Sequence, residues 1–182
     1  MADQSTRTSP LTGRHGGSAG VRLTPAAPAS RISLRAPEAS MAALSTALGL
    51  TLPTAPKTSA QSGSRVALWL GPDEWLVIDQ DAVDLVAVAA GSGVLHSAAD
   101  VSHRNIGIIV SGPDVEACLS AGCPQDLSLS AFPVGACSRT LFGKVEIVLS
   151  RVEADTFRVE CWRSFSEYVF GLLAEASEDA AH

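Results

Sequence analysis

The stretch Asp-Val-Ser-His-Arg-Asn-Ile-Gly-Ile-Ile-Val-Ser-Gly-Pro-Asp-Val-Glu-Ala-Cys-Leu-Ser, residues 100–120, decides how the rest of the chain is interpreted. Its β-branched run from Ile106 to Val110 is long enough for a central strand and too short for an independent helix. Ser111-Gly-Pro-Asp114 then ends the strand and begins a helix, because proline pre-sets the backbone angle of a first helical turn and Ser111 can cap its free N–H groups. The segment is therefore predicted to be a strand, a tight turn and a helix.

The same order of signals occurs upstream. Ile32 to Arg35 has a short strand pattern, Pro37 stands at a helix start, and the Ala/Leu/Met-rich stretch that follows ends at Gly49. Each copy continues with a proline-containing loop, strands and a final helix. We therefore predict an α+β fold of two pseudo-repeated β-α-β-β-α halves, residues 30–91 and 104–176, with the sheets packed against helices.

The two halves are expected to form a single compact domain, residues 30–176, between two terminal segments. Residues 1–29 are rich in Ser, Thr, Gly, Ala and Pro and have no periodic apolar face, so a disordered tail is predicted. An organelle transit peptide is the alternative for this tail, but no amphipathic stripe supports it. The last residues, 177–182, are expected to be a flexible C-terminus.

Between these segments we expect a surface loop over residues 51–64, a helix capped by Asp81 over 81–90 and a link over 92–104. Three further strands are expected over 138–142, 145–149 and 157–162. Ser164 is expected to cap a final helix that packs on the sheet. Its apolar residues recur at three- and four-residue spacing, as in a one-sided stripe: Phe165, Tyr168, Val169, Leu172 and Leu173.

The first half contains a tryptophan hairpin, Trp69-Leu-Gly-Pro-Asp-Glu-Trp-Leu76. Its Gly-Pro-Asp centre has the composition of a turn between two strands, 65–70 and 74–79. Both strands carry apolar residues on both faces, which is expected where both faces are covered. Two interpretations follow: either the tryptophans are core residues, or Trp69 or Trp75 reaches the surface and anchors a partner, because tryptophan is enriched at binding hot spots.

Composition limits the class of protein. The chain has 182 residues, 46% of them hydrophobic and 18% charged, and a formal net charge of −6. An acidic chain without clustered Lys and Arg is not expected to bind nucleic acid, and no apolar run approaches the roughly 20 residues that span a bilayer. The four cysteines, Cys118, Cys123, Cys137 and Cys161, include no Cys-x-x-Cys pair. We therefore expect reduced thiols in the core, no zinc site and a cytoplasmic location.

The sequence contains no recognisable catalytic constellation. There is no Gly-rich phosphate loop and no Gly-x-Ser-x-Gly elbow. His96 and His103 are candidate ligands or acid–base groups, but lone histidines without a paired carboxylate or thiol are interpreted as structural. Asp100, Asp114 and Glu146 are candidate acids that stand singly. We therefore expect no catalytic, cofactor-binding or metal-binding residue in this chain.

Several of these motifs together carry a family resemblance. Asp100-Val-Ser-His103, followed by Val110-Ser-Gly-Pro-Asp114, Leu119 and Gly135, resembles the folate-binding fold of the glycine-cleavage aminomethyltransferases. The tryptophan hairpin and Arg163-Ser-Phe-Ser-Glu-Tyr168 are similar to a smaller relative, the gamma-subunit family of heterotetrameric sarcosine oxidase. The resemblance covers about residues 30–176 and implies an aminomethyltransferase-like fold.

One departure concerns folate chemistry. Where an aminomethyltransferase has Gly, two variable residues and a pair of aspartates that includes the catalytic one, this chain reads Gly143-Lys-Val-Glu-Ile147. Glu146 stands in place of the first acid and Ile147 in place of the second. The resemblance therefore implies a subunit that has no catalytic residue of its own.

The resemblance implies a complex that oxidatively demethylates sarcosine to glycine, with hydrogen peroxide and either formaldehyde or methylene-tetrahydrofolate as products. The partners would be large alpha and beta flavoprotein subunits and a small delta subunit, which would bind FAD, FMN, NAD and tetrahydrofolate. Trp69, Trp75 and Arg104 are then the candidate residues of the partner interface. The alternative, from another class, is a stand-alone folate-binding one-carbon transfer protein in which Glu146 replaces the missing acid.

Overall fold

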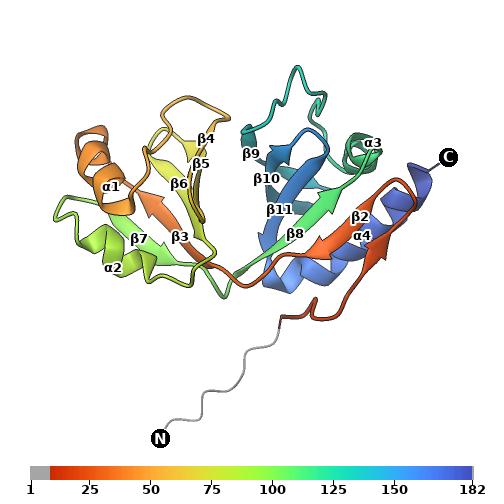
Figure 1. The fold of residues 1–182 in the computed structure, drawn as a ribbon, viewed down its shortest axis with the longest axis horizontal. Coiled ribbons are helices and arrows are strands. Elements are labelled where there is room, and N and C mark those ends of the chain that lie inside the picture. Colours follow the sequence, from red (N-terminus) through yellow and green to blue (C-terminus); the bar gives the residue numbers. More distant parts are fainter. Residues whose placement is uncertain (1–8, 182) are drawn as a thin grey trace, which may run out of the picture.

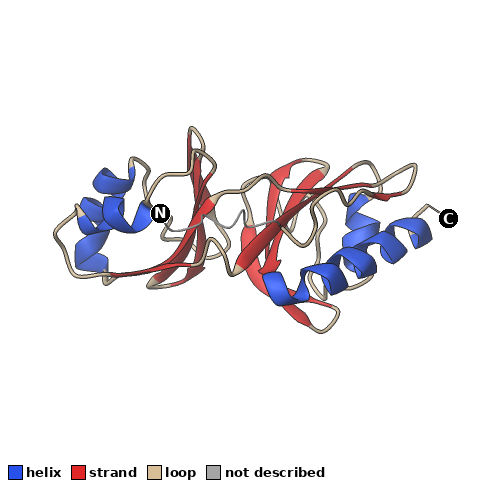
Figure 2. Cartoon of the chain, turned by 90° about the horizontal axis from the view of Figure 1, so that it is seen from below, coloured by secondary structure: helices blue, strands red, loops and turns tan. Residues whose placement is uncertain are grey.

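The structure of the chain is a computed structural model that describes residues 9–181. Its strands form two antiparallel sheets that face each other, with helices on the outside (Figure 1). Seen from below, the molecule has four layers in the order helices, sheet, sheet, helices (Figure 2). No helix of the described part of the chain is both long enough and apolar enough to cross a membrane.

The first sheet has five strands, in the spatial order β4 (Ser59–Ser62), β5 (Arg65–Gly71), β6 (Glu74–Asp79), β3 (Ser30–Arg35) and β7 (Ser97–Asp100). Its outer face is covered by two helices, α1 (Met41–Leu48), which continues the 3-10 turn η1 (Glu38–Ser40), and α2 (Leu85–Ala90). The core between sheet and helices contains Ile32, Leu34, Leu44, Trp75 and Val77.

The second sheet has six strands, in the order β1 (Gly16–Gly17), β2 (Arg22–Pro25), β8 (Asn105–Ser111), β11 (Thr156–Trp162), β10 (Val145–Glu153) and β9 (Cys137–Phe142). Its outer face is covered by α3 (Val115–Ser120) and α4 (Ser166–Asp179), the latter preceded by the 3-10 turn η2 (Arg163–Phe165). This larger core contains Ile108, Phe157, Val159, Val169 and Leu173.

The predicted α+β repeat is confirmed in its order of elements. In the first half β3 leads to α1, β4 to β6 and α2, and in the second half β8 leads to α3, β9 to β11 and α4. The last strand of each half pairs with the first, β6 with β3 and β11 with β8. The strands that precede the halves are exchanged, because β2 pairs with β8 while β7 pairs with β3. Each half's sheet is therefore completed by the strand that precedes the other half in the sequence.

The disorder predicted for residues 9–29 is wrong, because this segment belongs to the second sheet and its core. Leu23 pairs with Val110 in register, and three of the segment's side chains are fully buried: Leu11, Val21 and Leu23. The prediction failed because these few apolar residues, scattered among Ser, Gly, Ala and Pro, form no periodic pattern. The strand that pairs with β2, β8, is also distant in the sequence. The same prediction for residues 1–8 lies outside the described residues.

The flexible C-terminus predicted from residue 177 is also wrong at its start. Helix α4 continues to Asp179, and Ser177 is fully buried, with its hydroxyl donating to the Ala174 carbonyl oxygen at 2.7 Å. A serine whose hydroxyl is hydrogen-bonded within its own helix can be buried in a core. The polarity of Ser177 did not reveal this burial, so the sequence prediction ended the helix too early. Residue 182 lies outside the described residues.

Two short strands occupy segments that were predicted to be loop or link. Strand β4 lies within 51–64 and β7 within 92–104; their sequences, Ser-Ala-Gln-Ser and Ser-Ala-Ala-Asp, carry no apolar alternation. They form because a neighbouring strand offers hydrogen-bond partners. The helix predicted from Asp81 begins at Leu85 instead, with Asp84 accepting a hydrogen bond from the Ala87 N–H at 3.0 Å.

Candidate functional site

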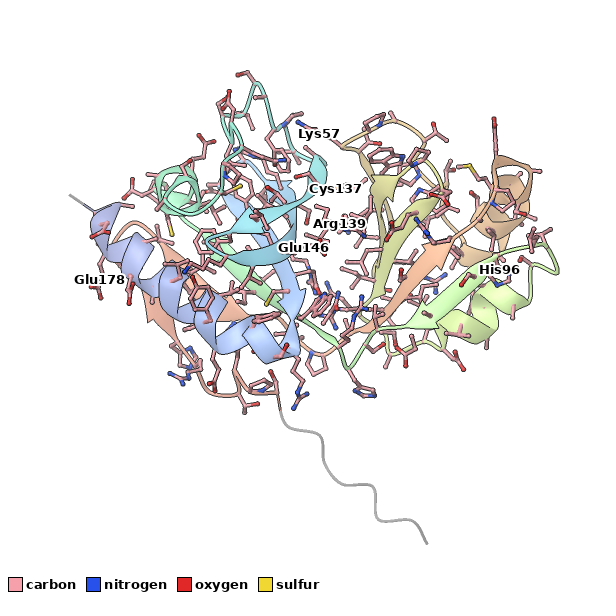
Figure 3. All side chains as sticks on the ribbon, turned by 180° about the vertical axis from the view of Figure 1, so that it is seen from behind. Lys57, His96, Cys137, Arg139, Glu146 and Glu178 are labelled. Carbon is pink, nitrogen blue, oxygen red and sulfur yellow. The ribbon has the colours of Figure 1, made fainter. Side chains whose placement is uncertain are left out.

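The inner faces of the two sheets pack against each other, and this contact is named here the inter-sheet seam. Its apolar part consists of Leu68, Leu76, Ile78, Val101, Cys137 and Val148. Backbone hydrogen bonds join the sheets at one margin, where the Ser59 N–H donates to the Gly135 oxygen at 3.0 Å and the Cys137 N–H donates to the Lys57 oxygen at 3.1 Å. Figure 3 shows Lys57 and Cys137 at this margin.

The seam also contains a buried charge cluster, named here the arginine–glutamate triad. Glu160 of β11 lies 2.8 Å from Arg31 of β3 and 2.7 Å from Arg158 of its own strand, with all three residues at most 7% exposed. Two guanidinium groups share one carboxylate, so the triad carries one excess positive charge. Gly107 of β8 lies against it, since a Cβ atom there would be 2.7 Å from Glu160 Oε1.

A chain of more exposed ion pairs closes the seam at the turn of the tryptophan hairpin. Glu74 of β6 lies 2.5 Å from Arg139 of β9, which in turn lies 3.9 Å from Glu146 of β10. The hydrogen bond with Glu74 is the main reason that the pKa of Arg139 is raised. Arg139 and Glu146 lie together where the two sheets face each other (Figure 3). These charges tie the sheets together.

The position of Glu146 tests whether folate fits this chain. Its carboxylate is 56% exposed, and the cleft that it lines with Arg104, Arg139 and Trp162 has a free volume of about 50 Å³. Pockets for drug-sized ligands are roughly 300 to 1,000 Å³. Ile147, in place of the second acid, points away into the core of the second sheet. The residues present do not fit a folate at this position.

A larger hollow lies at the opposite end of the seam. It has a volume of about 300 Å³ and is lined by aliphatic, hydroxyl and amide side chains, among them Val66, Ile109 and Ser150. Two charged side chains reach it, Arg151 and Arg158, and each already has a carboxylate partner, Glu116 and Glu160. Among the described residues, its lining contains serine hydroxyls but no His, Cys, Asp, Glu or Lys that could act on them as a general base.

The titratable groups that the sequence singled out belong to different elements and loops of the structure. Among residues 9–181, no group of three or more His, Cys, Asp and Glu side chains could hold a metal ion. His96 lies on the first half, with Nδ1 2.8 Å from the Val94 oxygen. Asp100 accepts a hydrogen bond from the Ser102 N–H at 2.8 Å, and Asp114 stands at the start of α3. Each of these contacts is local.

The four cysteines are free and buried. Burial raises the pKa of Cys118 and Cys137 to about 11 and that of Cys161 to about 12. Because the thiolate is the nucleophile and the metal ligand, thiols with such values are unreactive at neutral pH.

The structure separates the three predicted interface residues. Trp75 is fully buried and its indole N–H donates to the Pro53 oxygen at 2.8 Å, so its prediction as a surface contact is wrong. Trp69, paired with Trp75 across the hairpin, is half-buried against the first core. Both rings face the helices because the pairing places them on the same side of the sheet. Arg104 alone of the three is exposed.

Arg104 lies over the ring of Trp162, and two further exposed aromatic side chains, Phe165 and Tyr168, follow Trp162 along the chain. None of the three was predicted as a surface. Trp162, Phe165 and Tyr168 are 43%, 44% and 47% exposed. The sequence prediction placed Phe165 and Tyr168 in the buried stripe of the last helix. The stripe that is buried instead consists of Ser166, Val169, Phe170, Leu173, Ala176 and Ser177. Because two of its residues are serines, a hydropathy pattern does not show this buried stripe. The three-residue spacing of Trp162, Phe165 and Tyr168 is the sequence signal that could have indicated the exposed aromatic side chains.

Comparison with known proteins gives consistent relatives. The family model described as "SoxG: Sarcosine oxidase, gamma subunit family" matches residues 34–179. Sarcosine oxidase subunit gamma of Corynebacterium sp. (strain P-1) is 33% identical over 166 residues, which are 88% of this chain and 82% of that protein. Its counterpart in Arthrobacter sp. is also 33% identical, over 159 residues that are 84% of this chain and 78% of that protein.

Solved structures agree with these relatives. A chain of heterotetrameric sarcosine oxidase from Corynebacterium sp. U-96, in complex with pyrrole 2-carboxylate, superimposes with a TM-score of 0.87 at 26% identity and covers 97% of both chains. The glycine cleavage system aminomethyltransferase T from Bartonella henselae has a TM-score of 0.68 at 14% identity, over 86% of this chain and 46% of that one, which is a likeness of fold. Because the family model spans most of its length, the chain belongs to the sarcosine oxidase gamma subunit family.

Proposed function

We propose that this chain is the non-catalytic gamma subunit of a heterotetrameric sarcosine oxidase, to which it contributes structure and contact surface. The observation that carries the proposal is the likeness, over 97% of both chains, to a chain of the Corynebacterium complex. In the proposed reaction sarcosine, O2 and water give glycine, formaldehyde and hydrogen peroxide. With tetrahydrofolate as acceptor, methylene-tetrahydrofolate replaces formaldehyde and no water is consumed. The complex then serves sarcosine catabolism and one-carbon metabolism.

The proposal assigns the chemistry to partner subunits. The buried carboxylate of Glu160 is held by two arginines, and burial keeps the Cys118, Cys137 and Cys161 thiols protonated, so these groups are not available as general base or nucleophile. The small cleft at Glu146 supports placing tetrahydrofolate elsewhere. FAD, FMN and NAD are likewise assigned to the large alpha and beta subunits. The buried free thiols support a cytoplasmic location.

The experiment is co-expression of the alpha, beta and delta subunits of the same organism with and without this chain. We expect the tagged chain to co-purify with the other subunits. Sarcosine-dependent formation of hydrogen peroxide should be found in the purified complex that contains this chain. The chain alone should neither oxidise sarcosine nor show saturable binding of tetrahydrofolate by calorimetry. Within the complex, Glu146→Gln should leave the activity unchanged.

Two outcomes would contradict the proposal. Stoichiometric binding of tetrahydrofolate by the isolated chain, lost in Glu146→Gln, would support the stand-alone one-carbon transfer protein instead. Failure of the chain to associate with the flavoprotein subunits would remove it from the complex.

A further inference from the structure

Resting on the proposed function, we infer that the chain binds a large subunit of the complex through the surface formed by Arg104, Trp162, Phe165 and Tyr168, named here the aromatic strip. The occupant is a segment of that subunit that presents a carboxylate beside apolar side chains. The inference follows from the contacts, exposure and charge of these four residues.

The aromatic side chains of the strip follow one another along the junction of β11, η2 and α4. Trp162 ends β11, Phe165 ends η2 and Tyr168 lies in the first turn of α4. The rings of Trp162 and Phe165 have centroids 6.2 Å apart. Within residues 9–181, every aromatic side chain among the exposed large apolar residues belongs to this strip. Grouped exposed aromatics are typical of a binding surface, because single exposed aliphatic residues occur on any protein whereas interfaces are enriched in Trp, Tyr and Phe.

Arg104 gives the strip its specificity for a carboxylate. Its guanidinium lies 5.1 Å above the centre of the Trp162 ring, and its Nε donates to the Asn105 amide oxygen at 3.4 Å. Six arginines of residues 9–181 have a carboxylate within ion-pair distance: Arg31, Arg35, Arg65, Arg139, Arg151 and Arg158. Arg104 instead has the Trp162 ring and the Asn105 amide as its contacts. A guanidinium stacked on an indole is already oriented, and its remaining N–H groups form the planar fork that binds a carboxylate in bidentate fashion.

The charge near Trp162 favours the same ligand. The cleft beside Arg104 and Trp162 is also lined by Arg139, Glu74, Glu146 and Glu160, and Glu160 is held by Arg31 and Arg158. These four arginines and three glutamates leave one excess positive charge at this end of the strip. The other end has Glu167 in the first turn of α4. A partner carboxylate is therefore drawn to the Trp162 end, although the chain as a whole has a net charge of −6.

The strip is held in place before any partner binds. The Arg163 N–H donates to the Arg104 oxygen at 2.6 Å and the Ser166 hydroxyl donates to the Arg163 oxygen at 2.8 Å, which fixes η2 against the turn before β8. Tyr168 packs over the β9–β10 turn, where a Cβ atom at Gly143 would lie 3.0 Å from its hydroxyl oxygen. Ordered aromatic and arginine side chains lose little freedom on binding, which is typical of hot-spot residues.

The test measures the affinity of the purified chain for the alpha–beta–delta complex by biolayer interferometry, with the wild type as reference. We expect Trp162→Ala and Arg104→Glu each to raise the dissociation constant about 30-fold or more. Arg104→Gln should weaken binding less and make the affinity less dependent on NaCl concentration, because it removes the charge and keeps much of the side chain. Matched controls are Leu95→Ala, at a 77% exposed apolar residue, and Arg14→Glu, at an exposed arginine, which should bind like the wild type.

A thermal melt of each variant checks that it remains folded before its affinity is interpreted. The possible outcomes distinguish this inference from the proposed function. Wild-type affinity of folded Trp162→Ala and Arg104→Glu overturns this inference and leaves the proposed function intact. A wild-type chain that does not bind the other subunits overturns the proposed function and this inference with it. Self-association of the isolated chain that Trp162→Ala abolishes, with unchanged binding to the other subunits, assigns the strip to a second copy and overturns the inference.

Discussion

At the scale of single residues, Gly107 makes room for the buried charges of the seam. A Cβ atom at this position would lie 2.7 Å from Glu160 Oε1 and 2.8 Å from Arg158 Nη2. Gly107→Ala should therefore destabilise the chain by about 1 to 3 kcal/mol, as overpacking does in a close-packed interior. Urea unfolding followed by circular dichroism measures this free energy.

The matched control for this prediction is Gly171→Ala on α4, where nothing lies within 4 Å of the added Cβ atom. This change should stabilise the chain by up to about 1 kcal/mol, because alanine has the higher helix propensity. Equal stability of the two variants would show that the triad tolerates displacement.

The buried cysteines predict how stability depends on high pH. Burial raises the pKa of Cys118 and Cys137 to about 11 and of Cys161 to about 12, above the usual thiol value. The folded state therefore favours the protonated thiol, so this stability is complete below the unfolded pKa of about 8.5 and is lost as pH rises toward the folded values. The melting temperature should fall between about pH 9 and pH 11 by less in Cys161→Ala than in the wild type, after correction for the difference at pH 7.

A thiol reagent checks the same burial independently. Ellman's reagent at pH 8 should react with the native chain slowly and with the denatured chain quickly at all four cysteines. Rapid labelling of the native chain would contradict the described burial.

At the scale of elements, β2 is a structural part of the second sheet. Leu23 is 1% exposed and lies opposite Val110. Leu23→Ala should cost about 2 to 5 kcal/mol of unfolding free energy, as for other buried leucines. Leu95→Ala, at a 77% exposed leucine, should stay within about 0.5 kcal/mol of the wild type. Chemical denaturation compares the two, and a Leu23→Ala variant as stable as the wild type would support the disordered tail predicted from the sequence.

The tryptophan hairpin supplies core packing for the first sheet. Trp75 fills a fully buried site and donates its indole N–H to Pro53. Trp75→Ala should cost about 3 to 5 kcal/mol, a large share of the stability of a small protein, and lower the melting temperature strongly. Trp162→Ala, at a 43% exposed ring, should change the melting temperature of the isolated chain little. Similar melts for both would place Trp75 outside the core.

These elements show what local sequence can and cannot predict. The Pro72 turn and the run Ile106 to Val110 were predictable because their signals lie within a few residues. Strands β4 and β7 were not, since Ser and Ala pair there only because a neighbouring strand is present. In α4 the helical period was right and the predicted stripe is buried at Val169 and Leu173 but exposed at Phe165 and Tyr168. Ser166 and Ser177 instead occupy core positions that a hydropathy pattern assigns to solvent.

At the scale of the whole molecule, the sequence predicted the family and the paired halves but not the exchange of strands between them. The resemblance carried by the Trp69–Leu76 hairpin is confirmed by the match over residues 34–179. Of the candidate interface residues, Arg104 was named from the sequence and its role stays a prediction, whereas the burial of Trp75 required knowledge of which strand lies opposite. Long-range pairing is the information that local patterns lack.

The exchange makes the halves depend on each other. A fragment of residues 103–182 lacks β2 and three buried side chains of the N-terminal segment, Leu11, Val21 and Leu23, so it should not melt cooperatively alone. Addition of the fragment of residues 1–102, which contains β2, should restore a cooperative transition that circular dichroism can follow. A fragment 103–182 that melts cooperatively by itself would show that the donated strand is dispensable.

The exchange of β2 also sets an order of events during synthesis on the ribosome. Strand β2 leaves the exit tunnel well before its partner β8, which follows only after every strand of the first sheet has been made. The first sheet is complete once β7 has emerged, so it can form while translation continues. Through that interval Val21 and Leu23 remain without their core, and the nascent chain is exposed to chaperones and to aggregation until the last quarter of the protein has been translated.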